Sequence, residues 1–124
     1  MKVLLSIKPE FADKIFDGTK KFEFRRTIFT RSHINTALVY ASFPVQRVIG
    51  EFEISQVLFD DIDNLWLRTR DYAGIDKACF LKYFSDKNKG YAIEIKKVRK
   101  YKNPLHLQER FQIQPPQSFA YILY

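Results

Sequence analysis

The feature that most constrains this chain is a helix, a glycine and a strand that follow one another near the N-terminus. Residues 9–17 place apolar side chains on one helical face, and a proline occupies the first turn. Gly18 is the expected end of that helix. Phe22 and Phe24 then alternate with charged residues, as in a half-buried strand. The sequence therefore predicts a helix and a strand that meet at one corner of a core.

Three charged residues lie at this corner, namely Lys20, Glu23 and Arg25. The period of two in a strand puts Glu23 and Arg25 on one face, and Lys20 on the face of the phenylalanines if the strand begins that early. Lysine on an apolar face near a strand end would lie at the mouth of a core. One interpretation is that Arg25 and Lys20 bind phosphate or a base edge while Glu23 orients Arg25 or accepts from a base. The other is an outward Glu–Arg surface pair that contributes at most about 1 kcal/mol.

The rest of the chain predicts an α+β domain over residues 1–124. Strands are expected over residues 2–7, 37–41, 45–58, 91–101 and 119–123, and helical segments over 60–70, 77–84 and 105–110. Gly50 indicates a bulge or a close approach within its strand. Asn103 and Pro104 are expected to break the strand that precedes them, and Asp76 is expected to cap a helix. Five or six strands with two or three short helices indicate a small, strongly curved sheet or barrel.

Positive charge narrows the class of partner. The formal net charge is +7 and the sequence pI about 9.5, which favours polyanions, of which nucleic acid is the commonest. Residues 1–31 and 87–110 are rich in lysine and arginine, whereas residues 51–63 hold five acids and no base. The two basic regions would form one electropositive face if they converged, and scattered solvated lysines are the alternative.

A basic stretch with an aromatic residue at its centre lies within the second region. Arg99, Lys100 and Lys102 surround Tyr101, a composition that suits single-stranded nucleic acid. A solvated strand end is an equally good interpretation.

The number of cysteines and the length of the apolar runs indicate the cellular compartment of the protein. The single cysteine, Cys79, excludes a disulfide framework and fits a reducing cytosol. Cys79 lies near apolar residues of a predicted helix and is expected to be buried and inert. Residues 1–8 are too short an apolar run for a signal peptide, and no run approaches the roughly 20 apolar residues of a membrane helix. We therefore expect a cytoplasmic protein that does not associate with membranes.

Neither a metal nor a cofactor is expected from the motifs. His33, His106 and the cysteine lack metal-ligand spacing. Asp60, Asp61 and Asp63 could hold Mg²⁺, but an acidic cluster at a helix start explains them better. The chain also lacks a nucleotide-binding glycine loop.

The corner motif resembles a known family. Gly18, Lys20, Glu23 and Arg25 reproduce the GxKxxExR signature of the ASCH domain, a relative of the PUA domains. Flanking motifs extend the resemblance over nearly the whole chain, at residues 6–9, 40–44, 50–51, 83–93 and 115–121. These motifs are similar to a branch described as predicted transcriptional regulators.

This resemblance implies a PUA-like mixed β-barrel with helices beside it, and a cleft lined by the signature. RNA or a nucleotide-like ligand would bind there, and DNA is possible. Some relatives act in RNA metabolism or coactivation and one resembles a ribonuclease. Others resemble amidohydrolases that deacylate a modified cytidine with a lysine, a threonine and a glutamate. Lys20 matches that lysine, but Glu23 takes the place of the threonine, so the chain departs from that triad.

Five further residues are candidates for the cleft. Lys8 could face it from the start of the first helix, and Arg26 could add a phosphate contact, although either could be an ordinary exposed cation. Phe43 could stack on a base or pack in the core, and Ser42 and Ser118 could supply hydroxyl groups.

Three functions follow. The first is a nucleic-acid-binding domain, and the second is a hydrolase acting on RNA or a nucleoside, with Lys20 and Glu23 as catalytic candidates. Lys20 would need a lowered pKa to act as a base near neutral pH; burial beside Arg25 would lower that pKa and Glu23 would oppose the change. The third is a regulatory domain that binds a protein or a metabolite. Oligomeric state stays open.

Overall fold

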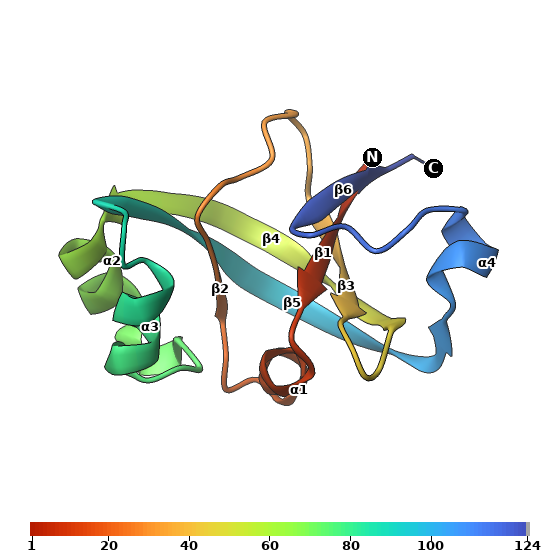
Figure 1. The fold of residues 1–124 in the computed structure, drawn as a ribbon, viewed down its shortest axis with the longest axis horizontal. Coiled ribbons are helices and arrows are strands. Elements are labelled where there is room, and N and C mark those ends of the chain that lie inside the picture. Colours follow the sequence, from red (N-terminus) through yellow and green to blue (C-terminus); the bar gives the residue numbers. More distant parts are fainter. Residues whose placement is uncertain (124) are drawn as a thin grey trace.

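A computed structural model describes residues 1–123 of the chain, in which six strands form one mixed sheet with short helices outside it (Figure 1). The elements in chain order are β1 (Lys2–Ile7), α1 (Pro9–Asp17), β2 (Phe22–Arg25), β3 (Thr36–Ala41), β4 (Arg47–Asp61), α2 (Ile62–Thr69), the 3₁₀ turn η1 (Arg70–Tyr72), α3 (Lys77–Tyr83), β5 (Lys89–Leu105), α4 (Leu107–Phe111) and β6 (Phe119–Ile122). The predicted α+β fold class is confirmed. Within these residues, none of the helices is both long and apolar enough to cross a membrane.

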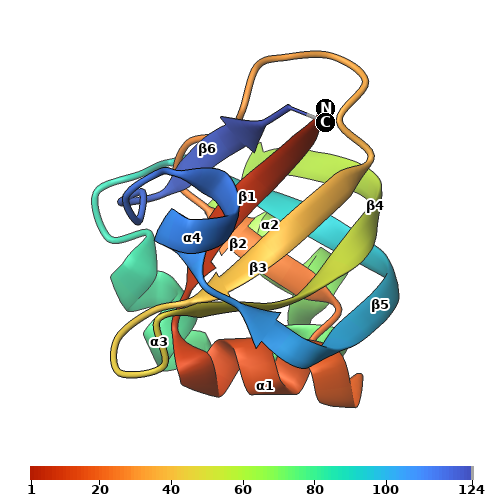
Figure 2. The ribbon, with the colours of Figure 1, turned by 90° about the vertical axis from the view of Figure 1, so that its right-hand side faces the viewer.

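The strand order is β2-β5-β4-β3-β1-β6. Only β1 and β3 pair in parallel, and the long strands β4 and β5 form an antiparallel ribbon that extends beyond the other strands (Figure 1). The first and last strands pair antiparallel and lie side by side (Figure 2). The sheet curves so strongly that the end of β2 reaches β1, where Arg25 Nη2 donates to the Ser6 carbonyl at 3.0 Å.

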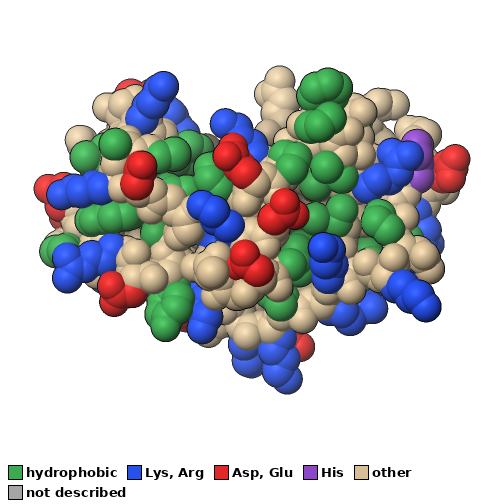
Figure 3. Space-filling view, turned by 90° about the horizontal axis from the view of Figure 1, so that it is seen from below, with side chains coloured by type: hydrophobic (Ala, Val, Ile, Leu, Met, Phe, Trp, Pro, Cys, Tyr) green, Lys and Arg blue, Asp and Glu red, His purple; other side chains and the backbone are tan. Residues whose placement is uncertain are grey.

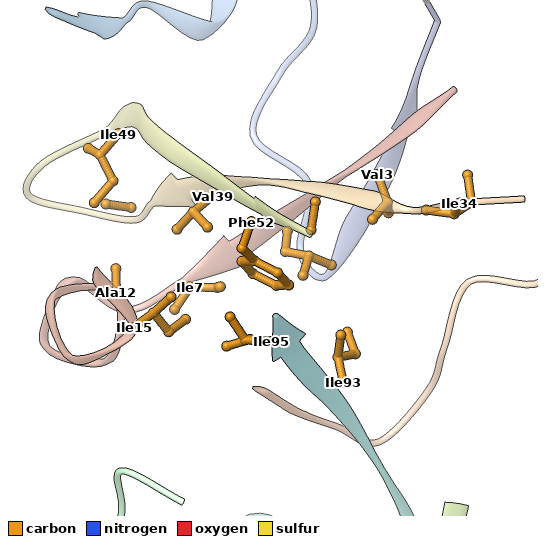
Figure 4. Close-up of a cluster of buried hydrophobic side chains, with 13 residues drawn as sticks. Val3, Ile7, Ala12, Ile15, Ile34, Val39, Ile49, Phe52, Ile93 and Ile95 are labelled. Atoms are coloured by element: carbon orange, nitrogen blue, oxygen red, sulfur yellow. The ribbon is translucent and has the colours of Figure 1, made fainter. Parts of the chain in front are cut away.

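The main core lies between the inner face of the sheet and α1 (Figure 4). Ala12 and Ile15 of α1 lie in one buried cluster with Ile7, Phe52 and Ile95 of the sheet. Full burial of each large apolar side chain contributes about 1.5–3 kcal/mol. This packing fixes the first turn of α1 beside the end of β1.

A second apolar cluster joins α2 and α3 to β2. Phe80 of α3 and Phe84, the residue that follows this helix, are buried, and the Phe80 ring meets the Phe24 ring edge to face at a centroid distance of 5.0 Å. The side chain of Leu65 from α2 completes the contact. The cluster holds α3 against β2, so the remaining faces of these two elements border the same space.

Two local predictions have opposite outcomes. At Gly50 a Cβ would lie 2.5 Å from the Phe16 ring and 2.7 Å from the Arg99 carbonyl oxygen, so the predicted close approach is confirmed. The predicted strand break at Asn103 and Pro104 is wrong, since β5 continues to Leu105. The ladder to β4 passes from Lys100 directly to Leu105, so the N–H group that proline lacks is not needed by the neighbouring strand.

Candidate functional site

A cavity of about 1150 Å³ opens where β1 and β2 end, between the start of α1, the β3–β4 turn, α3 and the segment before β6. The eight residues selected from the sequence all line it: Lys8, Lys20, Glu23, Arg25, Arg26, Ser42, Phe43 and Ser118. Other residues that line the cavity were not selected from the sequence, although Tyr40 and Tyr83 belong to the flanking motifs: Phe11, Tyr40, Gln46, Ile75, Cys79, Lys82 and Tyr83. The cavity therefore unites the corner motif with segments that are distant in sequence.

Lys20 is buried at this cavity, with 2% of its surface exposed. Its ammonium donates to the Ala73 carbonyl at 2.7 Å and lies 4.9 Å from the Phe24 ring centroid and 5.5 Å from that of Phe11. Strand β2 begins only at Phe22, so the condition under which Lys20 would share a strand face with Phe22 and Phe24 is not met. Its ammonium nevertheless lies beside apolar side chains, as that prediction required. Burial lowers the pKa of Lys20, and the Glu23 carboxylate opposes that change. The site thus holds a poorly solvated cation close to a carboxylate.

Glu23 and Arg25 form a buried ion pair, with Arg25 Nη2 and Glu23 Oε2 3.1 Å apart. The interpretation of an outward surface pair is therefore wrong, because the curved sheet encloses this face of β2. Arg25 Nη1 also donates to the carbonyl and hydroxyl oxygens of Ser118, each at 3.2 Å, and Nη2 donates to the Ser6 carbonyl. Both terminal nitrogens of Arg25 therefore donate to protein groups, and the guanidinium links β2 to β1 and to the segment before β6.

The cations at the rim differ in their availability. Arg26 donates to the Tyr83 carbonyl at 3.3 Å and forms an ion pair with Asp86. Lys8 occupies the N-cap position of α1 and Lys82 lies on α3, and both are exposed. Within residues 1–123 neither lysine has an ion pair or a side-chain hydrogen bond. These two ammonium groups are available to an anionic ligand.

Phe43 is 78% exposed at the edge of the cavity, so the alternative that placed it in the core is wrong. The turn that carries it is fixed at both ends, because the Ser42 amide donates to the Ile7 carbonyl at 3.0 Å and the Val45 amide to the Ser42 carbonyl at 3.1 Å. An exposed aromatic ring on a fixed turn suits stacking with a nucleobase.

Cys79 is exposed and lines the cavity, which corrects the expectation that it is buried. Phe80 forms the buried side of α3 together with Phe84, which follows the helix, and Cys79 precedes Phe80 on the neighbouring side. Asp76 accepts a hydrogen bond from the Cys79 amide at 2.8 Å, as expected for the helix cap. In a helix this short, the periodicity did not distinguish the core side from the cavity side.

The second basic region, residues 87–110, lies outside the cavity. Arg99 pairs with Glu51 at 3.0 Å and lies 5.0 Å from the Tyr101 ring centroid, while the Tyr101 hydroxyl donates to Glu51 at 2.7 Å. None of residues 87–110 lines the cavity. From below, basic side chains are spread with acidic and hydrophobic ones between them (Figure 3). Of the two alternatives left open by the sequence, convergence of both basic regions on one face is not found at this cavity.

Three of the five acids in the middle of the chain, Asp60, Asp61 and Asp63, lie at the start of α2. Asp61 is the N-cap and Asp63 lies in the first turn, as expected for a helix start. The Asp60 carboxylate accepts from Arg68 Nη1 at 3.1 Å. Among the residues described, 1–123, no group of three or more His, Cys, Asp or Glu side chains could hold a metal ion.

Comparison with known proteins identifies the family. The ASCH domain profile matches residues 5–105. The chain belongs to the ASCH domain family. It is 30% identical over 125 residues to an ASCH domain-containing ribonuclease of Zymomonas mobilis, covering 98% of this chain and 84% of that protein. The crystal structure of ASCH from Zymomonas mobilis superposes with a TM-score of 0.90 at 30% identity, over 98% of this chain and 87% of that one.

A second relative is much longer. The chain is 28% identical over 120 residues to the large ribosomal subunit protein uL22 of Ureaplasma parvum. The match covers 97% of this chain but only 39% of that protein. The chain therefore spans well under half the length of that curated relative.

Proposed function

We propose that this ASCH domain is a ribonuclease whose active site is the cavity around Lys20 and Glu23. The observation that carries the proposal is the buried Lys20 ammonium, which uses one of its three N–H groups to donate a hydrogen bond to the Ala73 carbonyl while it borders an open cavity. The likeness to the Zymomonas mobilis ribonuclease, which extends over nearly the whole chain, supports RNA as the substrate.

RNA would bind through its phosphates and one base. Lys8 and Lys82 supply ammonium groups at the rim, and Phe43 supplies an exposed ring on which a base can stack. The phosphate contacts make binding sensitive to salt, because bound cations displace counterions from the nucleic acid. Stacking is compatible with any base, so this arrangement favours RNA with unpaired bases.

The chemistry needs a proton acceptor and a stabilising cation. Glu23 would take the proton from a ribose 2′-hydroxyl, whose oxygen then bonds to the adjacent phosphorus while the bond to the 5′-oxygen breaks. Lys20 would stabilise the charge on the phosphate oxygens and give a proton to the departing 5′-oxygen, which its lowered pKa favours. The products would be a 2′,3′-cyclic phosphate and a free 5′-hydroxyl. Arg25 would hold the Glu23 carboxylate in place.

A nucleic-acid-binding domain without turnover, with a role in RNA metabolism or transcription-related regulation, is the second candidate. The exposed Phe43 ring and the rim lysines favour it, because they serve binding without any chemical step. DNA remains possible for that candidate. For either candidate we propose a cytoplasmic location, which the single cysteine of the chain fits.

The test is cleavage of a labelled single-stranded RNA followed on a denaturing gel, with binding measured by fluorescence anisotropy at several salt concentrations. Wild type should cut the RNA, whereas Lys20→Met and Glu23→Gln should reduce the rate by about 10²–10³-fold. Lys21→Met is the matched control, since it removes the same charge from an adjacent exposed residue outside the cavity, and it should retain activity. A 2′-deoxy group at the cut site should prevent cleavage.

Two results would contradict the proposal. Intact RNA with salt-sensitive binding that depends on Lys20 would favour the binding domain. Absence of binding at low salt would exclude both oligonucleotide functions and leave a free nucleoside, such as the acylated cytidine of the amidohydrolase branch, or another small ligand.

A further inference from the structure

A short loop of residues 72–74 closes over the Lys20 side chain. Its three successive carbonyl oxygens accept hydrogen bonds from the Lys21 amide at 2.9 Å, the Lys20 ammonium at 2.7 Å and the Lys14 ammonium at 3.0 Å. The loop is therefore fastened both to the end of α1 and to the start of β2. It forms the wall against which the buried lysine lies.

Gly74 is the point of closest contact. Its φ of +72° is a conformation that side chains other than glycine rarely adopt. A Cβ at this position would lie 2.5, 2.6 and 2.8 Å from Cβ, Cγ and Cδ of Lys20. The lysine stem thus fills the space that any other residue at position 74 would need.

We propose that Gly74 is a positioning residue that holds the Lys20 ammonium at the cavity wall. The inference rests on the proposed function for its effect on RNA cleavage, but the positioning itself can be measured without RNA. A lysine side chain has four rotatable bonds and loses much rotamer freedom when it is fixed. The glycine backbone restricts the stem on one side while the Phe24 and Phe11 rings lie near the ammonium. The remaining protons of the ammonium are thereby held beside the cavity.

The chain offers a matched control for backbone strain. Gly18 at the end of α1 also has a positive φ, +86°, but a Cβ there meets nothing within 4 Å. Gly18→Ala therefore adds a methyl group at a strained φ without touching Lys20. Gly74→Ala adds the same group at a similar φ and displaces the lysine stem.

The first measurement is the titration of Lys20 by NMR, using lysine labelled with ¹³C at Cε. The charged or titratable groups that act on the Lys20 ammonium are Glu23, Lys14, Cys79 and Arg25, and the two alanine variants retain all of them. Wild type and Gly18→Ala should show the lowered pKa that burial produces. In Gly74→Ala the ammonium should leave its buried place, so that its pKa rises toward that of an exposed lysine. An unchanged Lys20 titration in Gly74→Ala would overturn the proposal.

The second measurement is RNA cleavage. Gly74→Ala should lose activity to about the level of Lys20→Met, some 10²-fold or more, whereas Gly18→Ala should stay within a few-fold of wild type. Full activity in Gly74→Ala would also overturn the proposal. If wild type cuts no RNA while the Lys20 titration still moves in Gly74→Ala, the ribonuclease proposal fails and the positioning role stands.

A second variant covers the case in which Gly74→Ala does not fold. Asparagine tolerates positive φ better than alanine but still carries a Cβ. Gly74→Asn should raise the pKa of Lys20 in the same way. A folded Gly74→Asn protein with the wild-type titration would refute the positioning role.

Discussion

Replacing Arg25 with methionine would show how much its guanidinium contributes to the stability of the folded protein. The change removes the partner of a buried carboxylate, since Glu23 lies 3.1 Å away and is 8% exposed. Removing one member of a buried ion pair costs about 3–5 kcal/mol. The carbonyl oxygens of Ser6 and Ser118 also lose a charged donor, although the Ser118 carbonyl still accepts from the Ser6 amide at 3.0 Å. We expect about 3–5 kcal/mol in total. A domain of this size has about 5–15 kcal/mol of stability, so the loss would be a large fraction of it.

The assay is equilibrium unfolding in urea, which compares the free energy of unfolding of wild type and variants at constant slope. Arg26→Met is the matched control because it removes the same side chain from the next residue. Arg26 pairs with Asp86 at the surface, where the two side chains are 37% and 68% exposed, and such a pair contributes about 0–1 kcal/mol. The Arg25 variant should therefore be several kcal/mol less stable than the Arg26 variant.

A double variant isolates the ion pair itself. Glu23→Gln combined with Arg25→Met leaves no unpaired carboxylate, so the double variant should be less destabilised than the sum of the two single changes. If Arg25→Met lowered the free energy of unfolding by less than about 1 kcal/mol, as Arg26→Met should, the stabilising role of the Arg25 contacts would be refuted. Arg25 could then serve as a ligand for phosphate.

Two further changes address the cavity. Phe43→Ala should leave the free energy of unfolding within about 0.5 kcal/mol of wild type, because Phe43 is 78% exposed. The same change should weaken the binding of single-stranded RNA, measured by fluorescence anisotropy, by about 1–3 kcal/mol. Unchanged affinity would exclude stacking of a base on this ring. Burial lowers the pKa of Lys20, so the unfolded chain binds the proton of this lysine more tightly than the folded protein does. Burying the charged lysine therefore reduces the free energy of unfolding by its full amount at pH values below the folded pKa. This reduction disappears as the pH rises to about 10.4, the pKa of a lysine in the unfolded chain. Urea unfolding between pH 7 and 10 should thus show wild type gaining stability relative to Lys20→Met as pH rises, and a constant difference would contradict the burial of a charged lysine.

Local patterns determined much of the fold. Residues 9–17 were predicted as a helix and residues 2–7 as a strand, and α1 and β1 have these bounds. Helix periodicity, the first-turn proline and a terminal glycine act within a few residues, so they can be recognised without knowledge of the tertiary structure. The alternation of Phe22 and Phe24 indicated that Lys20 lies near their apolar side chains, although Lys20 precedes β2, and the corner motif indicated the ASCH family.

Tertiary structure decided what the selected residues contact. The acceptor for the Lys20 ammonium is 53 residues away, and the Ser118 oxygens that fix Arg25 are 93 residues away. Sequence patterns tell which face of a strand a side chain occupies, but not whether sheet curvature will enclose that face or leave it in water. Arg25 is therefore buried and links three segments, the Phe43 side chain is exposed, and Cys79 lines the cavity. These outcomes depend on strand order and helix packing, which join segments whose local sequences carry no information about one another.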